Sequence, residues 1–248
     1  MIKFIGCSFT EGGGLDNIDY YNFITNANFS YNDKRHYSYR LFIKKSLQRF
    51  RDKHRFSNIV GNKLNLESIN LAISRGSNDY ILKTLFDEID NNSNEIYVAI
   101  FSMFSRVRWY YEKTRKIYNL NSFDFNWPPY DKEPIMKSLS ETYEMYLTNI
   151  YNLDVEKEKI KIQVKLLDNY AKSKNSKIYW SSWDDFYELE KITNNCITFD
   201  NKFLYKYVDS EKLQIHHHTD YKVNDNHLSV IGNEIIADKI YTVIKNNL

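Results

Sequence analysis

A serine near the start of the chain and an aspartate and a histidine near its end have the residue types that acyl transfer needs. Ser8 follows a short apolar run, and Asp225 and His227 precede the last amphipathic stretch. A serine hydroxyl becomes a good nucleophile when a histidine removes its proton, and a carboxylate orients that histidine and stabilises the imidazolium. These residues therefore predict a catalytic set with Ser8 as nucleophile, His227 as general base and Asp225 as orienter.

Acyl transfer also requires fixed donors for the oxyanion that forms on the substrate. The candidates are the backbone N–H groups of Ser8 and Gly76 and the side-chain amide of Asn78. Gly76 has an alternative explanation as a helix C-cap or a position of positive φ. Serine and aspartate are also common in turns, so the pairing of Ser8 with Asp225 and His227 favours the catalytic interpretation. The chemistry requires no metal and no cofactor.

Arg75 and Arg106 each follow a predicted strand and could bind an anionic group of the substrate, although ordinary ion pairing at the surface explains them equally well. Several aromatic residues could line a carbohydrate-binding groove or simply pack on the body of the protein. These aromatic residues are Trp109, Tyr110, Tyr111, Trp127 and Tyr130.

The run His216-His217-His218, followed by Asp220, contains metal-ligating residue types. Neighbours on an extended chain point to opposite sides, so we expect a solvated loop here and no metal site. By the same alternation, Cys7 should point away from Ser8 and pack as a small hydrophobic side chain.

Strands and helices alternate along the chain according to the apolar pattern. Strands are expected at 2–6, 68–72, 95–102 and 177–180, and an additional strand within 196–204. Helices are expected at 37–60 (one or two), 80–89, 135–172 (one or two) and 231–244 with Ser229 as N-cap. All three prolines lie between 128 and 134, so we expect the aromatic-rich segment around 109–134 to be irregular.

This order predicts an α/β fold in which right-handed crossovers build a parallel sheet of about five strands between two layers of helices. In such a sheet, ligands bind beyond the carboxyl ends of the strands. Ser8, Gly76 and Asn78 should therefore lie at the same edge. The length of 248 residues fits a single domain over 1–248.

Composition narrows the classes of partner. The 34 Lys and Arg residues nearly balance the 32 Asp and Glu residues, which makes nucleic acid an unexpected partner. Two cysteines cannot form a disulfide framework, and the sequence contains neither an apolar run long enough for a membrane span nor a signal-peptide core. We therefore expect a cytoplasmic protein that acts on a small molecule or a glycan ester and not at a membrane; its oligomeric state is left open.

Three segments together resemble the conserved blocks of the SGNH (GDSL-like) hydrolase superfamily. Residues 6–12 (GCSFTEG) are similar to its first block, with Cys before the serine where Asp is usual. Residues 70–78 (NLAISRGSN) resemble the second block, with Gly76 at the oxyanion position, and residues 225–232 (DNHLSVIG) resemble the last. The blocks occur in the order of the family.

The resemblance implies a flavodoxin-like α/β/α sandwich and a serine esterase or deacylase that works through a Ser8 acyl-enzyme. The acyl ester could be on a carbohydrate or a lipid. An acyltransferase with the same residues, or a non-catalytic carbohydrate-binding or structural relative, are the alternatives.

Two departures from the family pattern concern the predicted site. The third block of the family is Gly-x-Asn-Asp, whereas residues 101–106 are FSMFSR, so Ser102 or Asn78 would have to replace its asparagine, unless the hole has only backbone donors. Leu228 stands where proline is usual, and in an alternative register His227 would pair with Asn224 instead of Asp225.

Overall fold

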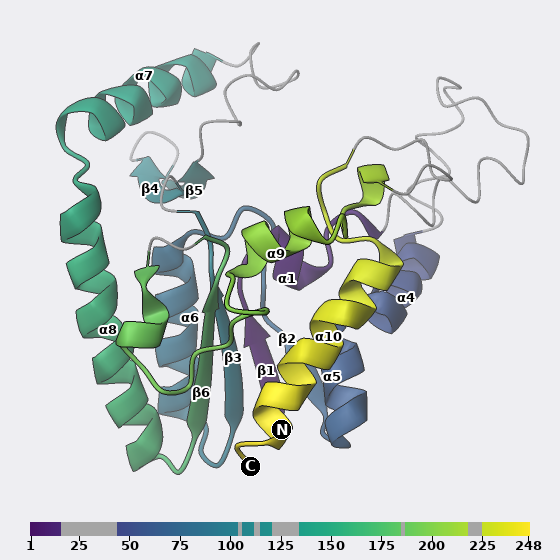
Figure 1. Ribbon diagram of the computed structural model, residues 1–248. Coiled ribbons are helices and arrows are strands. Elements are labelled where there is room, and N and C mark those ends of the chain that lie inside the picture. The colour runs from purple at the N-terminus through teal and green to yellow at the C-terminus, as the bar shows by residue number, and fades with distance from the viewer. Residues whose placement is uncertain (16–43, 104–105, 112–114, 121–133, 185–186, 218–224) are drawn as a thin grey trace, which may run out of the picture.

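The core of the molecule is a parallel sheet of four strands, seen in a computed structural model (Figure 1). The structure describes residues 1–15, 44–103, 106–111, 115–120, 134–184, 187–217 and 225–248. The sheet has the order β2-β1-β3-β6. Its strands are β1 (Ile2–Ile5), β2 (Ser68–Asn70), β3 (Ile96–Phe101) and β6 (Lys177–Ser182).

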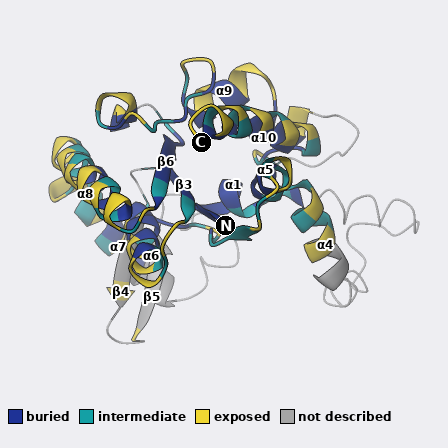
Figure 2. Ribbon diagram, turned by 90° about the horizontal axis from the view of Figure 1, so that it is seen from below, coloured by how far each residue is buried: buried dark blue, intermediate teal, exposed yellow. Residues whose placement is uncertain are grey.

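Helices cover both faces of the sheet (Figure 2). One face packs against α5 (Phe56–Leu64), α9 (Leu204–Ser210) and α10 (Val230–Lys245). The other face packs against α6 (Asn78–Asn91) and α8 (Leu153–Ser173). Residues of β3 alternate between the two cores, since Val98 faces the first and Tyr97 the second. The expected α/β architecture with a parallel sheet between helix layers is thus confirmed.

The strand order contains one reversal of direction. After β1 the chain passes through α5 to β2 on one side, and after β2 it returns through α6 to β3 on the other side of β1. Right-handed crossovers that run in opposite directions must place their helices on opposite faces, as α5 and α6 are. The reversal lies between β1 and β3, where an open sheet forms its binding crevice.

Two of the expected helical regions contain two helices each. The first includes α4 (Lys44–His54) and α5, while residues 37–43 lie outside the described part of the chain. The second includes α7 (Pro134–Asn149) and α8. Ser229 caps α10 as expected, because its hydroxyl accepts from the Gly232 N–H at 3.0 Å.

The prediction of a strand within 196–204 was wrong. Cys196 makes an isolated parallel bridge to Trp180, and Phe199 then pairs with Lys202 across a turn before α9 begins at Leu204. Asp200 and Asn201 have φ of 51° and 61°, which is left-handed backbone that cannot continue a strand.

The segment expected to be irregular begins as a regular hairpin. Strands β4 (Val107–Tyr111) and β5 (Lys116–Leu120) pair antiparallel, with Val107 opposite Leu120. Aromatic and β-branched residues favour this extended pairing, and all three prolines come later in the chain. Residues 112–114 and 121–133, which include Trp127 and Tyr130, lie outside the described ranges.

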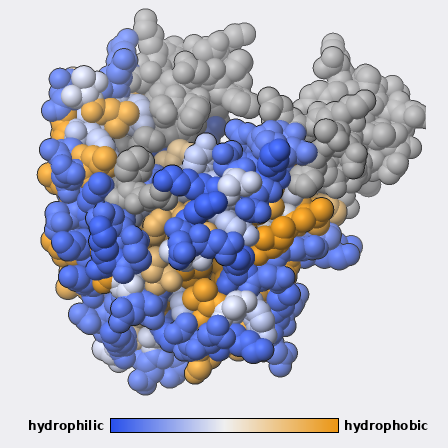
Figure 3. Space-filling model, viewed as in Figure 1, coloured by the Kyte–Doolittle hydropathy of each residue, from blue (hydrophilic) through white to orange (hydrophobic). Residues whose placement is uncertain are grey.

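The outer surface mixes charged and apolar side chains (Figure 3). Hydrophilic side chains cover much of the face shown, and apolar ones interrupt them along α10, where Ile231 is 54% exposed. Among the helices of the described ranges, none combines the length and the apolar character needed to span a membrane.

Asn233 is expected to stabilise the packing of α10 on α5. Its buried side chain accepts from the Phe56 N–H at 3.0 Å and donates to the Ser229 carbonyl at 2.9 Å. Asn233→Ala should lower the free energy of unfolding by about 1–3 kcal/mol, because it leaves a buried N–H without an acceptor. Urea denaturation measures this loss. The exposed Asn91→Ala is the control and should change stability by less than about 0.5 kcal/mol; equal effects would contradict the assignment.

Candidate active site

Ser8 lies just beyond the carboxyl end of β1. It is the first residue of the short helix α1 (Ser8–Glu11) and is 7% exposed. The Asn70 amide, at the end of β2, donates to the Thr10 carbonyl at 2.6 Å and so ties α1 to the neighbouring strand. The serine is therefore held on a short, fixed turn at the edge where the sequence predicts it.

Asp225 and His227 form a hydrogen-bonded pair. Asp225 Oδ1 lies 2.6 Å from His227 Nδ1 and also accepts from the His227 backbone N–H at 2.8 Å. A carboxylate only accepts, so Nδ1 carries the hydrogen and Nε2 of the neutral ring is an acceptor. Asp225 is thus the partner of His227, as expected, and the alternative partner Asn224 lies outside the described residues.

Backbone pairing fixes this loop in place. The segment before it runs antiparallel to it, with the Ile215 N–H donating to the His227 carbonyl at 2.9 Å and Gln214 bridging Leu228. The His216 N–H donates to the Asp225 carbonyl at 3.1 Å. Asp225 and His227 therefore lie on a segment that is paired with residues 214–216 and leads directly into α10.

Two glycines after α1 allow the histidine to approach the serine backbone. A Cβ atom on Gly13 would lie 2.8 Å from His227 Nε2 and 2.9 Å from the Ser8 carbonyl oxygen. A Cβ atom on Gly14, which has φ of +85°, would lie 2.7 Å from His227 Cβ. The imidazole thus rests on bare main chain beside Ser8, and Gly13 and Gly14 are required for that approach.

Aromatic rings hold the imidazole from the side. The rings of His227 and Phe9 are 4.7 Å apart between centroids, and Phe9 lies 3.8 Å from Trp183, which follows β6. The structure contains no hydrogen bond between Ser8 Oγ and His227, whose Nε2 lies over Gly13. Such contacts are often longer without substrate, and the imidazole lies beside the main chain of Gly13 and Ser8.

Gly76 does not have positive φ, so that alternative was wrong. A Cβ atom on it would lie 2.8 Å from the Gly6 carbonyl oxygen, which explains why glycine is needed where this loop meets the loop after β1. Its N–H donates to the Ile73 carbonyl at 3.1 Å and closes a turn. The Gly76 N–H is therefore used within this turn, which differs from the role of oxyanion donor that we expected.

Asn78 belongs to a buried network with Tyr187 and Ser102. Asn78 Oδ1 accepts from the Ser102 N–H at 2.8 Å, and Asn78 Nδ2 donates to the Tyr187 hydroxyl at 2.5 Å. That hydroxyl donates to the Ser102 carbonyl at 2.6 Å. Asn78 therefore fixes the turn after β3, a role that differs from the expected oxyanion donor. We call these three residues the Ser102 clamp.

The Ser102 hydroxyl itself is a further polar group at this edge. The residue is 1% exposed, and its Oγ has no hydrogen-bond partner in the described part of the chain. Sequence reasoning considered Ser102 but missed Tyr187 and Trp183, although both come soon after the strand that ends at Ser182. Their position after a strand end was the available signal.

The other predicted residues have separate surroundings. Arg75 lies in the turn after β2 with φ of 62°. Cys7 is buried in the core, as expected. The rings of His216 and His217 lie 3.9 Å apart between centroids and are tilted by 45°, and within the described ranges no three ligating side chains gather to hold a metal. His218 and Asp220 lie outside those ranges.

Comparison with known proteins adds no assignment. No protein-family model matches the chain, and no curated protein matches it significantly.

Tyr187→Phe should destabilise the protein by about 1–3 kcal/mol, because the Ser102 carbonyl and the Asn78 amide lose their partner. Burial raises the pKa of Tyr187 well above its ordinary value, so the unfolded tyrosine releases its proton above pH 10 while the folded one retains it. The free energy of unfolding should therefore fall as the pH rises above 10. The slope should be shallower in Tyr187→Phe than in wild type, by up to about 1.4 kcal/mol per pH unit.

Urea denaturation at pH 7 and at pH values above 10 measures both effects. Tyr205→Phe is the matched control, since Tyr205 is 47% exposed. Equal stability of Tyr187→Phe and Tyr205→Phe at pH 7 would contradict the clamp.

Proposed function

We propose that this protein is a serine hydrolase that cleaves an ester-linked acyl group, possessing the SGNH-type fold and catalytic set that the sequence resembles. The observation that carries the proposal is the Asp225–His227 pair resting on Gly13 beside Ser8. The strand order β2-β1-β3-β6 is compatible with a flavodoxin-like sheet, and the pair meets Ser8 at the reversal of that order.

In the first step, Ser8 Oγ attacks the acyl carbonyl carbon while His227 Nε2 takes the hydroxyl proton. Asp225 stabilises the resulting imidazolium through Nδ1, at 2.6 Å. The tetrahedral intermediate then collapses, the bond to the alcohol breaks, and His227 returns the proton to the leaving oxygen. Water repeats the sequence on the acyl-enzyme and releases the acid.

The oxyanion needs donors that are fixed before the reaction. The Ser8 N–H lies in the first turn of a helix, where N–H groups have no partner within the helix. The Ser102 hydroxyl, held by the Ser102 clamp and without a partner of its own, is the second donor we propose. It takes the place of the missing third-block asparagine, and Asn78 acts as a positioning residue behind it.

The nucleophile can be tested with a fluorophosphonate probe and intact-mass detection. Wild-type protein should gain one adduct, Ser8→Ala none, and His227→Ala should react about 100-fold to 10,000-fold more slowly because it lacks the base. Ser74→Ala removes an exposed serine at the same sheet edge and should react like wild type.

If neither the wild type nor any variant is labelled, and p-nitrophenyl acetate is also untouched, the non-catalytic alternative replaces this proposal. If labelling occurs, adding an acceptor alcohol distinguishes the two enzymes. Release of free acid alone indicates a hydrolase, and acyl transfer to the alcohol indicates an acyltransferase.

Gly13→Ala should slow labelling by about 100-fold, because a methyl group there displaces the imidazole and misplaced catalytic groups lose about that factor. Gly61→Ala is the control, since its new methyl would lie 2.5 Å from Ser68 Cβ in the contact between α5 and β2. Gly61→Ala should lose stability but keep the labelling rate of the folded protein. Unchanged labelling of Gly13→Ala would contradict the role of the glycine.

A further inference from the structure

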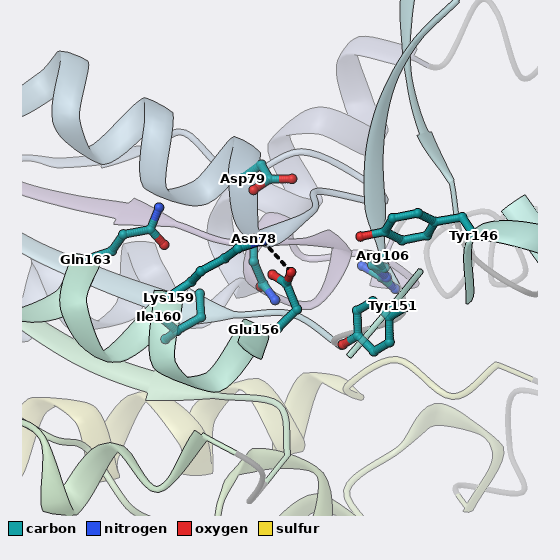
Figure 4. Close-up of a pocket in the computed structure, with 9 residues that line it drawn as sticks. All are labelled: Asn78, Asp79, Arg106, Tyr146, Tyr151, Glu156, Lys159, Ile160 and Gln163. Atoms are coloured by element: carbon teal, nitrogen blue, oxygen red, sulfur yellow. Dashed lines mark hydrogen bonds and ion pairs between the residues drawn. The ribbon is translucent and has the colours of Figure 1, made fainter. Parts of the chain in front are cut away.

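A polar pocket lies between the start of α6, the turn from α7 into α8, and Arg106, the residue before β4 (Figure 4). Asn78, Tyr146, Tyr151, Glu156 and Lys159 also line it. None of these residues belongs to the set formed by Ser8, Asp225 and His227. The pocket shares Asn78 with the Ser102 clamp, and its other lining residues need their own explanation.

Three buried donor groups in this pocket have no hydrogen-bond partner in the described part of the chain. They are Nε and Nη1 of Arg106 and the hydroxyl of Tyr151. An unpaired buried donor costs free energy, and an unpaired buried charge costs more. Among the described residues, no carboxylate forms an ion pair with Arg106, although Asp79 and Glu156 line the same pocket.

The two carboxylates that line the pocket, Asp79 and Glu156, are not ion-paired with Arg106. Glu156 is paired with Lys159 at 2.6 Å (Figure 4), and Asp79 is exposed, where solvent screens its charge. The groups without a partner are thus all donors: two N–H groups of the Arg106 cation and the hydroxyl of Tyr151.

Tyr151 remains a donor at neutral pH. Burial, together with the negative charge of Glu156, raises its pKa above the ordinary value, so the hydroxyl keeps its proton. Figure 4 shows the ring of Tyr151 beside Arg106. The ring centroids of Tyr146 and Tyr151 are 6.0 Å apart. Two aromatic rings therefore border the guanidinium.

We propose that this pocket binds a small molecule through a carboxylate or phosphate group, with Arg106 and Tyr151 donating to its oxygens. A carboxylate or phosphate accepts from all three groups and also carries the charge opposite to that of Arg106, and the guanidinium geometry suits these two anions. The ligand compensates the buried charge. This inference does not depend on Ser8 being a nucleophile.

Titration calorimetry of the full chain tests the proposal with two probes, succinate and inorganic phosphate, at matched ionic strength. Saturable binding of one of them is expected, and the arm that binds identifies the anion. Arg106→Gln should weaken binding about 10-fold to 100-fold, as expected for lost hydrogen bonds to a charged group. Tyr151→Phe should weaken it less, since it removes one donor.

Two variants serve as controls. Lys161→Gln removes a positive charge from the same helix as Lys159 but away from the pocket lining, and it should bind like wild type. Ser8→Ala should also bind like wild type, which separates this site from the proposed catalytic one. Binding that is unchanged in Arg106→Gln, or no saturable binding of either probe to the wild type, would overturn the proposal.

The ligand-free protein gives a second measurement. Arg106→Gln should be at least as stable as wild type to urea, because it removes two buried nitrogen donors that have no partner in the described part of the chain. If Arg106→Gln fails to fold, Arg106 has a structural partner and the proposal is wrong. Arg106→Lys keeps the charge but loses the planar set of donors, so its binding should lie between those of Arg106→Gln and wild type.

Discussion

The reversal of strand order between β1 and β3 constrains both the helix layers and the loops that follow these strands. Because the chain leaves β1 toward one side and returns to β3 on the other, the loops after β1 and β3 diverge to opposite faces. Ser8 ends the first of these loops and Ser102 begins the second. The two helix layers then follow from the handedness of the crossovers, and the cores on both faces hold the strand ends in place.

Main-chain atoms as well as side chains shape the surroundings of His227. The imidazole lies on Gly13, its loop pairs with the segment that contains Ile215, and Asp225 accepts from its backbone as well as from its ring. The Ser102 clamp works similarly, because two side chains grip the N–H and the carbonyl of one residue. Buried main-chain groups that are paired in this way favour one arrangement of the turn.

The sequence was sufficient to predict the elements whose apolar pattern repeats or whose side chains bury large apolar surfaces. The run at 95–102 is apolar on both sides, which is why β3 could be predicted, and Ser229 before a helical stripe marked the start of α10. The pairing of Asp225 with His227 was predictable because the two residues are close in sequence.

Features that depend on distant contacts could not be predicted. The turn at Asp200 and Asn201 overrides a strand-like composition, and the proline cluster obscured the hairpin that comes before it. Nothing in the spacing of Asn78 and Tyr187 links them, since 109 positions separate them in the chain. Whether the Gly76 N–H is free or used in a turn depends on the conformation of Ile73, which sequence does not determine.

The antiparallel pairing of the segments around Ile215 and His227 has a further consequence. Ser8 follows a central strand of the sheet. Asp225 and His227 instead belong to these two paired segments, a ribbon that lies beside the sheet. Proteins open locally in units whose free energies span from near zero to that of global unfolding. A local opening of the ribbon would separate the base from the nucleophile while the sheet stayed folded. Hydrogen exchange at the Ile215 amide therefore reports on the integrity of the proposed catalytic set independently of the core.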